Sequence, residues 1–567
     1  MTYDLVIRNG VIVDGSGLPR YRGDVGVIGD RIAKIGRITD RGTEEIDAED
    51  HVVSPGFIDG HTHMDAQINW DPLGTSSCWH GVTSVVMGNC GFTLAPSRAG
   101  ARELVVRSLE RAEDISAAAM DAGIDWTWET YPEYLGALDR LPKGINYGGY
   151  VGHSALRTWA MGERAYSEEA GDDDMAVMEH ELRSSLRAGA LGFTTSRTFN
   201  HQTSDDRPVA SRLATWEEVA TLVRIMGDEG GGIFELAGED VGRDPDKRAD
   251  YFGRLEDLAV ETGCPITFGV GSGRFPKDEH QVLLDLLDRT AERGGRMFGQ
   301  AHAREFNVVL SFQTNTPFDG LAEWKDFRSW PLDEQLRALR DPSMREKLID
   351  AAEHGSWTKS VGAEARKPDY DWIRVMHGPM PPYKSVAEVA AERGVSPAEC
   401  MIDLALESDF EQFFLQPFAN GDLDVVLEIM KHPRTVTTFS DSGAHVSQLM
   451  DSSIQTHVLG HWTRELGAFT LEEAVRSLTL EPSTAWGFHD RGLLREGLKA
   501  DICVFDPGTV GPDMPAVAHD LPGGAVRLTQ KSVGIKATVV NGSPLTLDGE
   551  HTGNLPGQVL RGPLAVS

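Results

Sequence analysis

Short apolar runs separated by glycine-rich turns mark both ends of the chain. Four of them cover residues 4–10, 24–30, 500–506 and 533–542. Side chains that alternate between apolar and polar face opposite sides of a β-strand, so each run predicts a strand with one buried face. We therefore expect residues 1–54 and 490–567 to form one small β-sandwich from both termini, with the central region inserted between them.

The central region, residues 55–489, alternates apolar strands with helical stretches. From Gly56 onward it offers nine strand candidates, and those after the first cover residues 84–90, 144–153, 190–195, 232–236, 264–270, 296–300, 413–416 and 435–440. Strands that alternate with helices form a parallel sheet, which places the chain in the α/β class. This is one strand more than an eight-stranded barrel needs, and we expect the surplus strand near Phe413 or Met297.

A long stretch at about residues 316–410 departs from the alternation of strands and helices. It is mostly helical and polar in pattern and contains Trp324, Trp330, Trp357 and Trp372. Because connections within a compact domain are usually much shorter, the stretch predicts an insertion that closes over a site as a lid.

The segment Pro55–Asp65, with the sequence PGFIDGHTHMD, carries the clearest chemical signal. It predicts a short apolar strand that runs into His61 and His63, whose spacing points both side chains to one face. Two adjacent neutral imidazoles form half of a divalent-metal site, and imidazole suits zinc among other ions. Asp59 and Asp65 flank the pair and are expected to orient it. The alternative is a surface strand that carries two histidines by chance.

The length of the chain indicates its domain organisation, and its net charge excludes one class of partner. With 567 residues the chain is too long for one ordinary core and suits one large barrel plus a smaller domain. The formal net charge of −33 argues against a nucleic-acid partner, because phosphates require a basic surface.

The chain shows no sign of a membrane or secretory segment. No apolar run approaches the length of a membrane span, and the first residues lead directly into a predicted strand, so we expect no signal peptide. The five cysteines are widely spaced and odd in number, which argues against a disulfide framework. We expect a cytoplasmic protein that acts on a small molecule, and the sequence predicts no particular oligomeric state.

Several motifs follow the histidine pair in a fixed order. They are His80–Ser84 (HGVTS), Gly88–Gly91 (GNCG), Val151–Ser154 (VGHS), Ser440–Gly443 (SDSG) and Gly497–Asp501 (GLKAD). Together with PGFIDGHTHMD they resemble the amidohydrolase superfamily, and within it the N-acyl-D-amino-acid deacylase (D-aminoacylase) group, over nearly the whole chain. This resemblance implies a distorted (β/α)8 TIM barrel flanked by a β-sandwich from both termini, in agreement with the strand pattern.

The resemblance also implies a metal at the C-terminal mouth of the barrel, held by the histidine pair, a cysteine, two later histidines and an aspartate. His61, His63, Cys90 and Asp441 match this set. A thiolate at a strand end is a strong ligand for zinc, and an aspartate beside the metal can also take a proton from water. The alternatives are a buried core thiol for Cys90 and a turn residue for Asp441.

The two later histidines are absent. The fifth strand continues as Ile233–Glu239 and the sixth as Ile266–Arg274, and neither segment contains a histidine. Glu235 is therefore a candidate oxygen ligand, with pairing to a neighbouring base as the equal alternative. His201 and His302 also follow candidate strands, although a lone histidine after a strand is more often a loop residue.

Two further residues are candidates for contacts with a substrate. His153, at the end of the third strand, is placed to hydrogen-bond a carbonyl oxygen or oxyanion, and a structural role in its loop is the alternative. Arg197 follows the fourth strand and suits a substrate carboxylate, because a guanidinium binds that group at two points. Arg157 and Arg274 compete for this role.

We predict a metal-dependent hydrolase of C–N amide bonds, with Asp441 as general base and then general acid. The resemblance implies N-acyl amino acids, especially of D configuration, or related amides as substrates, and zinc as the divalent metal. Two alternatives remain open at this point. The missing histidines are consistent with a one-metal enzyme acting on a lactone, cyclic amide or carbon–carbon bond, or with a non-catalytic barrel kept as a scaffold.

Overall fold

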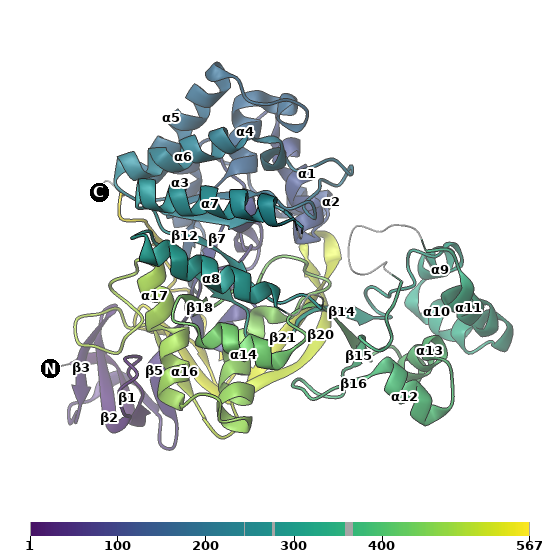
Figure 1. The fold of residues 1–567 in the computed structure, drawn as a ribbon. Helices are drawn as coiled ribbons and strands as arrows, with labels where there is room; N and C mark the ends of the chain where they lie inside the picture. Colours follow the sequence, from purple (N-terminus) through teal and green to yellow (C-terminus); the bar gives the residue numbers. More distant parts are fainter. Residues whose placement is uncertain (1, 243, 275–277, 358–366, 566–567) are drawn as a thin grey trace.

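Strands from the two termini share one sheet in the computed structural model, which describes residues 2–242, 244–274, 278–357 and 367–565 (Figure 1). The N-terminal strands are β1 (Tyr3–Ile12), β2 (Tyr21–Ile28), β3 (Arg31–Gly36), β4 (Gly42–Asp47) and β5 (Val52–Pro55). The C-terminal strands are β19 (Ile502–Phe505), β22 (Ile535–Val540), β23 (Ser543–Leu547) and β24 (Glu550–His551). Their order is β24-β23-β22-β19-β5-β1-β2-β3, with β4 paired to β1.

The two ends of the chain meet at the centre of this nine-stranded sheet. Strands β5 and β19 pair antiparallel with Val53 opposite Val504, and both valines are fully buried. The β structure predicted from both termini is therefore present as one sheet, and its arrangement as a sandwich stays a prediction.

Two further sheets carry the parallel strands of the central region. The first has the order β25-β8-β7-β6, with β6 (Phe57–Asp59), β7 (Val82–Met87), β8 (Asn146–Gly149) and β25 (Val559–Leu560). The second has the order β18-β13-β12-β11-β10-β9. Its strands are β9 (Val151–Gly152), β10 (Gly192–Ser196), β11 (Ile233–Ala237), β12 (Ile266–Val270), β13 (Met297–Ala301) and β18 (Thr435–Thr437).

The two parallel sheets approach each other at both edges. Tyr150 N donates to the Met87 carbonyl at 3.1 Å, next to the break between β8 and β9. At the other edge Thr62, beyond β6, forms a parallel bridge with Ser442, beyond β18. The C-terminal ends of β6 and β18 therefore lie side by side, and the loops that follow them can build one site.

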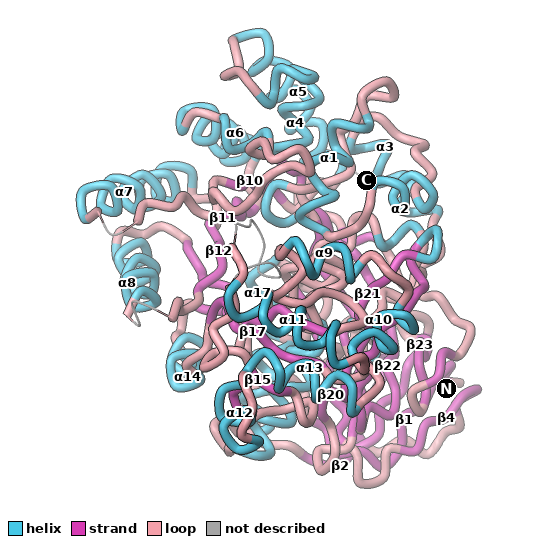
Figure 2. The backbone as a smooth tube through the Cα atoms, turned by 90° about the vertical axis from the view of Figure 1, so that its right-hand side faces the viewer, coloured by secondary structure: helices cyan, strands magenta, loops and turns pink. Residues whose placement is uncertain are grey.

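Helices that follow these strands cover their outer faces, and Figure 2 shows α4 to α8 outside β10, β11 and β12. The helices before β13 are α1 (Arg102–Glu113), α2 (Ala117–Gly123), α3 (Tyr131–Arg140), α4 (His153–Met161), α5 (Asp172–Ala188), α6 (Trp216–Glu229), α7 (Pro245–Thr262) and α8 (Glu279–Glu292). Later helices are α14 (Leu423–Lys431), α15 (Ile454–His457), α16 (Leu471–Leu478) and α17 (Leu480–Trp486). The α/β class predicted from the alternation is confirmed.

The insertion is larger than predicted and has its own core. It begins with β14 (Phe306–Ser311) and ends with β17 (Phe413–Ala419), which pair antiparallel in a four-stranded sheet with β15 (Arg374–Val375) and β16 (Lys384–Ser385). Between them lie α9 (Ala322–Arg328), α10 (Leu332–Leu339), α11 (Pro342–His354), α12 (Val386–Arg393) and α13 (Pro397–Glu407), which Figure 1 shows grouped to one side of the parallel strands. Residues 358–366 of the predicted insertion lie outside the described residues.

The strand near Phe413 is the surplus one among the nine candidates. It is β17, which pairs antiparallel with β14, whereas the strand at Met297 is β13 of the parallel sheet. Its apolar run resembles that of a buried parallel strand because Phe414 and Leu415 are fully buried in the core of the insertion and in a neighbouring cluster.

Part of the C-terminal region lies outside the terminal sheet. Strands β20 (Gly511–Leu521) and β21 (Ala525–Val533) form a separate hairpin, and β25 pairs with β8 among the parallel strands. Leu560 of β25 packs against Tyr150 and Leu191 there, so its burial depends on the central region. Within the described residues, no helix combines the length and the hydrophobicity that crossing a membrane requires.

Candidate metal centre

The histidine pair extends the edge of β6 into the mouth of the parallel strands. Thr62 N donates to the Val86 carbonyl on one side, and His63 N donates to the Ser442 carbonyl on the other. The backbone on each side therefore fixes this segment, and His61 and His63 are both buried with their rings 5.3 Å apart. Their projection to one site, predicted from the i and i+2 spacing, follows from this extended backbone.

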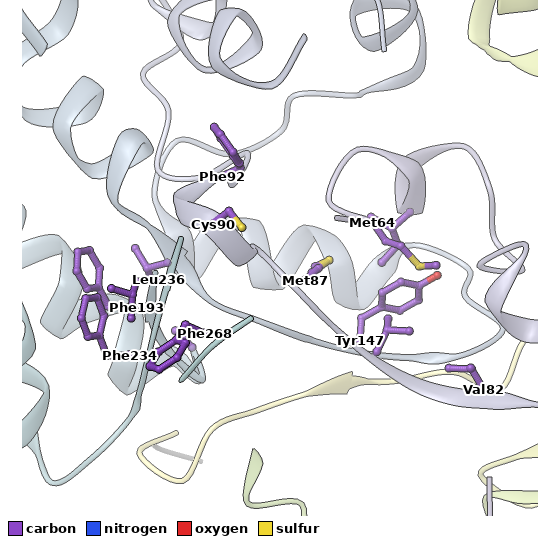
Figure 3. Close-up of a cluster of buried hydrophobic side chains, with 14 of the residues drawn as sticks. Met64, Val82, Met87, Cys90, Phe92, Tyr147, Phe193, Phe234, Leu236 and Phe268 are labelled. Atoms are coloured by element: carbon purple, nitrogen blue, oxygen red, sulfur yellow. The ribbon is translucent and has the colours of Figure 1, made fainter. Parts of the chain in front are cut away.

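A tight turn after β7 presents Cys90 to the same place. Gly88, Cys90 and Gly91 have φ values of 82°, 55° and 78°, so the glycines at both sides relieve a turn that few other residues adopt. The Asn89 amide donates to the carbonyls of Thr62 and Val86 at 3.0 Å each, which ties the turn to the histidine segment. Figure 3 shows Cys90 at the end of this turn between Phe92 and Met87.

His61, His63 and Cys90 bring their ligand atoms within 4.8 Å of one another. Cys90 Sγ lies 3.6 Å from His61 Nε2. Asp441 approaches both imidazoles, because its Oδ1 lies 3.2 Å from His61 Nε2 and 3.5 Å from His63 Nε2. Cys90 and Asp441 have positive φ values of 55° and 51°, and such strain is often found where a side chain is held for function.

Each histidine has an oxygen atom facing its Nδ1, while its Nε2 faces the centre. His61 Nδ1 donates to Gln300 Oε1 at 2.6 Å, and Gln300 in turn donates to Thr267 Oγ1 at 3.2 Å. Glu113 Oε1 lies 3.4 Å from His63 Nδ1. A carboxylate or amide oxygen at the outer nitrogen is the usual arrangement for a metal-binding histidine, because it fixes both the tautomer and the ring orientation.

Glu113 reaches the site from the last residue of α1. The following residue, Asp114, accepts hydrogen bonds from Ser447 N at 3.3 Å and Gln448 Nε2 at 3.4 Å, while Val446 N donates to the Glu113 carbonyl at 3.2 Å. The end of α1 is therefore attached to the loop that contains Asp441. Nothing in the local sequence around Glu113 indicates this position, since it depends on the packing of a helix against a distant loop.

The acidic groups beside the histidines shift the pKa values of the centre. Burial alone lowers the pKa of His61, but Cys90 and Asp441 outweigh it and raise this pKa to about 10. Burial alone would raise the pKa of Asp441, yet the imidazoles of His61 and His63 beside it hold this pKa well below its ordinary value. A cation is thus favoured at this point, and a metal ion would take the place of the protons on Nε2.

The donor set fits a divalent ion of the zinc type. Two imidazole nitrogens, one thiolate and one carboxylate are the ligand types zinc prefers in four-coordinate sites. Asp441 Oδ1 is buried and has no hydrogen-bond partner among the described residues, as expected for an atom that faces an ion or a reacting water.

Glu235 lies beside the centre and supports Cys90. Its Oε2 accepts a hydrogen bond from Cys90 N at 2.7 Å, and its Oε1 is 4.0 Å from Cys90 Sγ and 3.9 Å from His61 Nδ1. It does not belong to the group whose ligand atoms converge. Its contact with the Cys90 backbone explains how a buried carboxylate is held at this strand end.

Asp59 and Asp65 hold backbone groups of the centre. Asp59 Oδ1 accepts from His61 N at 3.2 Å and from Thr438 Oγ1 at 2.9 Å. Asp65 Oδ2 accepts from Gly88 N at 2.9 Å. The imidazole orientation predicted for the two aspartates is instead provided by Gln300 and Glu113.

His153 is part of a different buried cluster. Its Nε2 donates to Glu218 Oε1 and its Nδ1 accepts from Thr195 Oγ1, both at 2.8 Å. Arg157 also donates to Glu218, at 2.6 Å, and all three side chains are buried. Because both ring nitrogens of His153 are engaged, none is left for a substrate oxygen, and the structural alternative for this residue describes its contacts better.

The predicted arginines also have protein partners, and each of the two extra histidines has a partner at Nδ1. Arg197 Nε donates to Glu239 at 3.1 Å, and Arg274 pairs with Asp369. His201 Nδ1 bonds Ser196 Oγ at 2.7 Å, and His302 Nδ1 lies 2.9 Å from the Arg304 carbonyl. His201 and His302 do not belong to the converging ligand group.

Comparison with known proteins identifies the class. The chain belongs to the amidohydrolase family, whose model matches residues 44–545. D-aminoacylase of Alcaligenes xylosoxydans xylosoxydans is 28% identical, over 98% of this chain and 97% of that protein. N-acyl-D-aspartate deacylase of the same organism is 27% identical, over 98% and 95%. The crystal structure of N-acyl-D-glutamate deacylase from Bordetella bronchiseptica, in complex with zinc and a phosphonate mimic of the tetrahedral intermediate, is 26% identical with a TM-score of 0.66, and the match covers 99% of this chain and 100% of that one.

Proposed function

We propose that this protein hydrolyses the C–N amide bond of N-acyl amino acids, with a zinc-type divalent ion held by His61, His63, Cys90 and Asp441. The observation that carries the proposal is the convergence of His61, His63 and Cys90, with Asp441 Oδ1 beside both Nε2 atoms. Gln300 and Glu113 face the two Nδ1 atoms on the outer side. The names of the relatives favour substrates of D configuration.

A divalent ion at this position would lower the pKa of a water molecule toward about 7 and polarise the acyl carbonyl. The chain's own residues supply the proton transfers. Asp441 is ionised beside the two histidines and accepts a proton from the water as the water attacks the carbonyl carbon. The same carboxyl then gives the proton to the leaving nitrogen, so that an acid and a free amino acid are released.

We also propose a finer description of the fold. The edges of the two parallel sheets meet at Thr62 and Ser442 and at Met87 and Tyr150, which supports one distorted (β/α)8 barrel with the centre at its C-terminal mouth. Residues 1–54 and most of 490–567 form the second unit in this proposal. The closing of the insertion over the site stays a prediction.

Replacing Asp441 tests the mechanism. We expect Asp441→Asn, assayed with saturating zinc, to lower kcat for an N-acetyl-D-amino acid by about 10²- to 10⁴-fold, because the general base is lost. Metal content and circular dichroism check that the ion and the fold remain. A panel containing D and L acyl amino acids, a lactone and a cyclic amide identifies the bond that is cleaved. A variant as active as the wild type would exclude Asp441 as the base, and turnover of the lactone alone would exclude an acyl amino acid substrate.

A further inference from the structure

One side of the centre carries almost no ligand atoms. On β12 the inward-facing positions are Thr267, whose hydroxyl accepts a hydrogen bond from Gln300, and Gly269, which has no side chain. On β11 the corresponding residue is Glu235, and one of its oxygens is used by Cys90 N. Within the described part of the chain, His61, His63 and Cys90 are the one group of three or more such side chains whose ligand atoms converge.

The ring of Phe439 fills the space above Gly269. A Cβ atom at Gly269 would lie 2.5 Å from Phe439 Cε1, so this ring position requires glycine on β12. The same ring lies 4.1 Å from the ring of His61, centroid to centroid. It therefore stands between the histidine pair and the end of β12, where a second ion would need its own ligands.

Phe439 is held in an unusual backbone conformation. Its φ is 82°, a value that is costly for a residue with a bulky side chain. Phe306 packs beside it with a centroid distance of 5.7 Å, and Phe418 packs on Phe306 at 4.3 Å. An aromatic wall, consisting of these three phenylalanines, thus runs outward from the centre and supports the ring at His61.

We propose that Phe439 and Gly269 make this a one-metal centre, with the phenyl ring occupying the space that a second ion would need. This inference rests on the proposed function for the identity of the centre. Glu235 is the carboxylate beside Cys90, and no second group of three or more ligand atoms converges among the described residues, so a four-coordinate second ion would not bind tightly.

Metal titration of the wild type is the first test. The metal-free protein is titrated with Co²⁺, followed by the visible and thiolate charge-transfer absorption, and with Zn²⁺, followed by elemental analysis after gel filtration. We expect the absorption to saturate at about one equivalent and about one zinc ion to remain per chain. Retention of two ions per chain would overturn the proposal, and this measurement requires no variant to fold.

Variants then test the space-filling role. Phe439→Ala/Gly269→His removes the ring and supplies a donor on β12, and we expect it to retain a second ion. Phe439→Ala alone opens the space without a donor and should retain one ion, which makes it the matched control. If the double variant folds by circular dichroism, keeps its first ion and gains no second one, the ring is not what limits the centre.

A third variant tests the contact with the ring directly. Gly269→Ala places a methyl group against the Phe439 ring, which contacts the ring of His61. Because substitutions next to a metal ligand commonly weaken metal binding, we expect the affinity for the first ion to fall by about 10- to 100-fold. An unchanged affinity would show that Phe439 does not position His61. The number of bound ions tests this inference, whereas substrate turnover tests the proposed function. A protein that binds one ion but hydrolyses no substrate would therefore contradict the proposed function and leave this inference intact.

Discussion

His61 and His153 are both buried histidines at the ends of parallel strands, and they differ in how many ring nitrogens the protein occupies. Gln300 takes one nitrogen of His61, and the other faces Cys90 and Asp441. Glu218 and Thr195 take both nitrogens of His153. The first arrangement leaves a lone pair for an ion, whereas the second builds a closed network that stabilises the fold. Burial and position at a strand end therefore do not separate these two histidines, but the number of engaged ring nitrogens does.

The closed network should give the largest effect on stability. Replacing Glu218 by Gln leaves Arg157 buried without its counter-charge, and we expect the free energy of unfolding to fall by about 3–5 kcal/mol. Zinc content should not change, because Glu218 bonds His153 and Arg157 rather than a ligand of the centre. Chemical denaturation and elemental analysis measure the two quantities. Glu217→Gln, at the neighbouring exposed position on α6, is the control and should change neither. Loss of zinc from Glu218→Gln would contradict the separation of the two sites.

The outer partners of the metal histidines should affect ion binding instead. We expect Glu113→Gln to weaken the affinity for zinc by about 10- to 100-fold, because His63 loses the carboxylate at its Nδ1. Competition with a chromophoric chelator measures this change. Exposed Glu103 on the same helix provides the control variant, Glu103→Gln. A drop in stability with no change in zinc affinity would assign Glu113 to the core rather than to the centre.

The pH dependence of the unfolding free energy should show whether Glu218, in the same network, is ionised in the folded protein. Burial alone would raise the pKa of Glu218, but His153 and Arg157 lower it from 4.5 to about 2. A carboxyl whose pKa is lower in the folded state stabilises the fold above its unfolded pKa and loses this contribution as the pH falls. We expect the difference in unfolding free energy between wild type and Glu218→Gln to be constant above about pH 5 and to shrink toward pH 3. A difference that does not vary with pH would show that Glu218 is not ionised in the folded protein.

Arg197 should give the smallest effect of these variants. Its guanidinium already pairs with Glu239, so we expect Arg197→Ala to change KM for an acyl amino acid by less than about threefold, as is common for a partly exposed pair. A larger rise in KM, with kcat unchanged, would support the predicted contact with the substrate carboxylate.

Local spacing predicted the convergence of His61, His63 and Cys90 better than it predicted the residues that contact them. The i and i+2 histidines and the Gly-Asn-Cys-Gly turn are short-range features, and the backbone alone brings their side chains to the strand ends. Gln300 and Glu113 contact those histidines across 239 and 50 residues of sequence, so no local pattern pointed to them. The strand near Phe413 had the apolar run of a parallel strand, and only its pairing with β14 reveals that it belongs to the insertion.

The missing histidines illustrate the same limit. Their absence after the fifth and sixth strands was visible in the sequence, but what replaced them was not. Phe439 lies 170 positions beyond Gly269 and fills the vacant side only in the folded chain.

The assignment of the metal centre is decided by the metal content of the purified protein and of the His61→Ala/His63→Ala variant. We expect about one zinc-type ion per chain in the wild type and none in the double variant, with circular dichroism unchanged. A wild type that binds no divalent ion, or a variant that retains it, would contradict the assignment of the centre to His61, His63, Cys90 and Asp441.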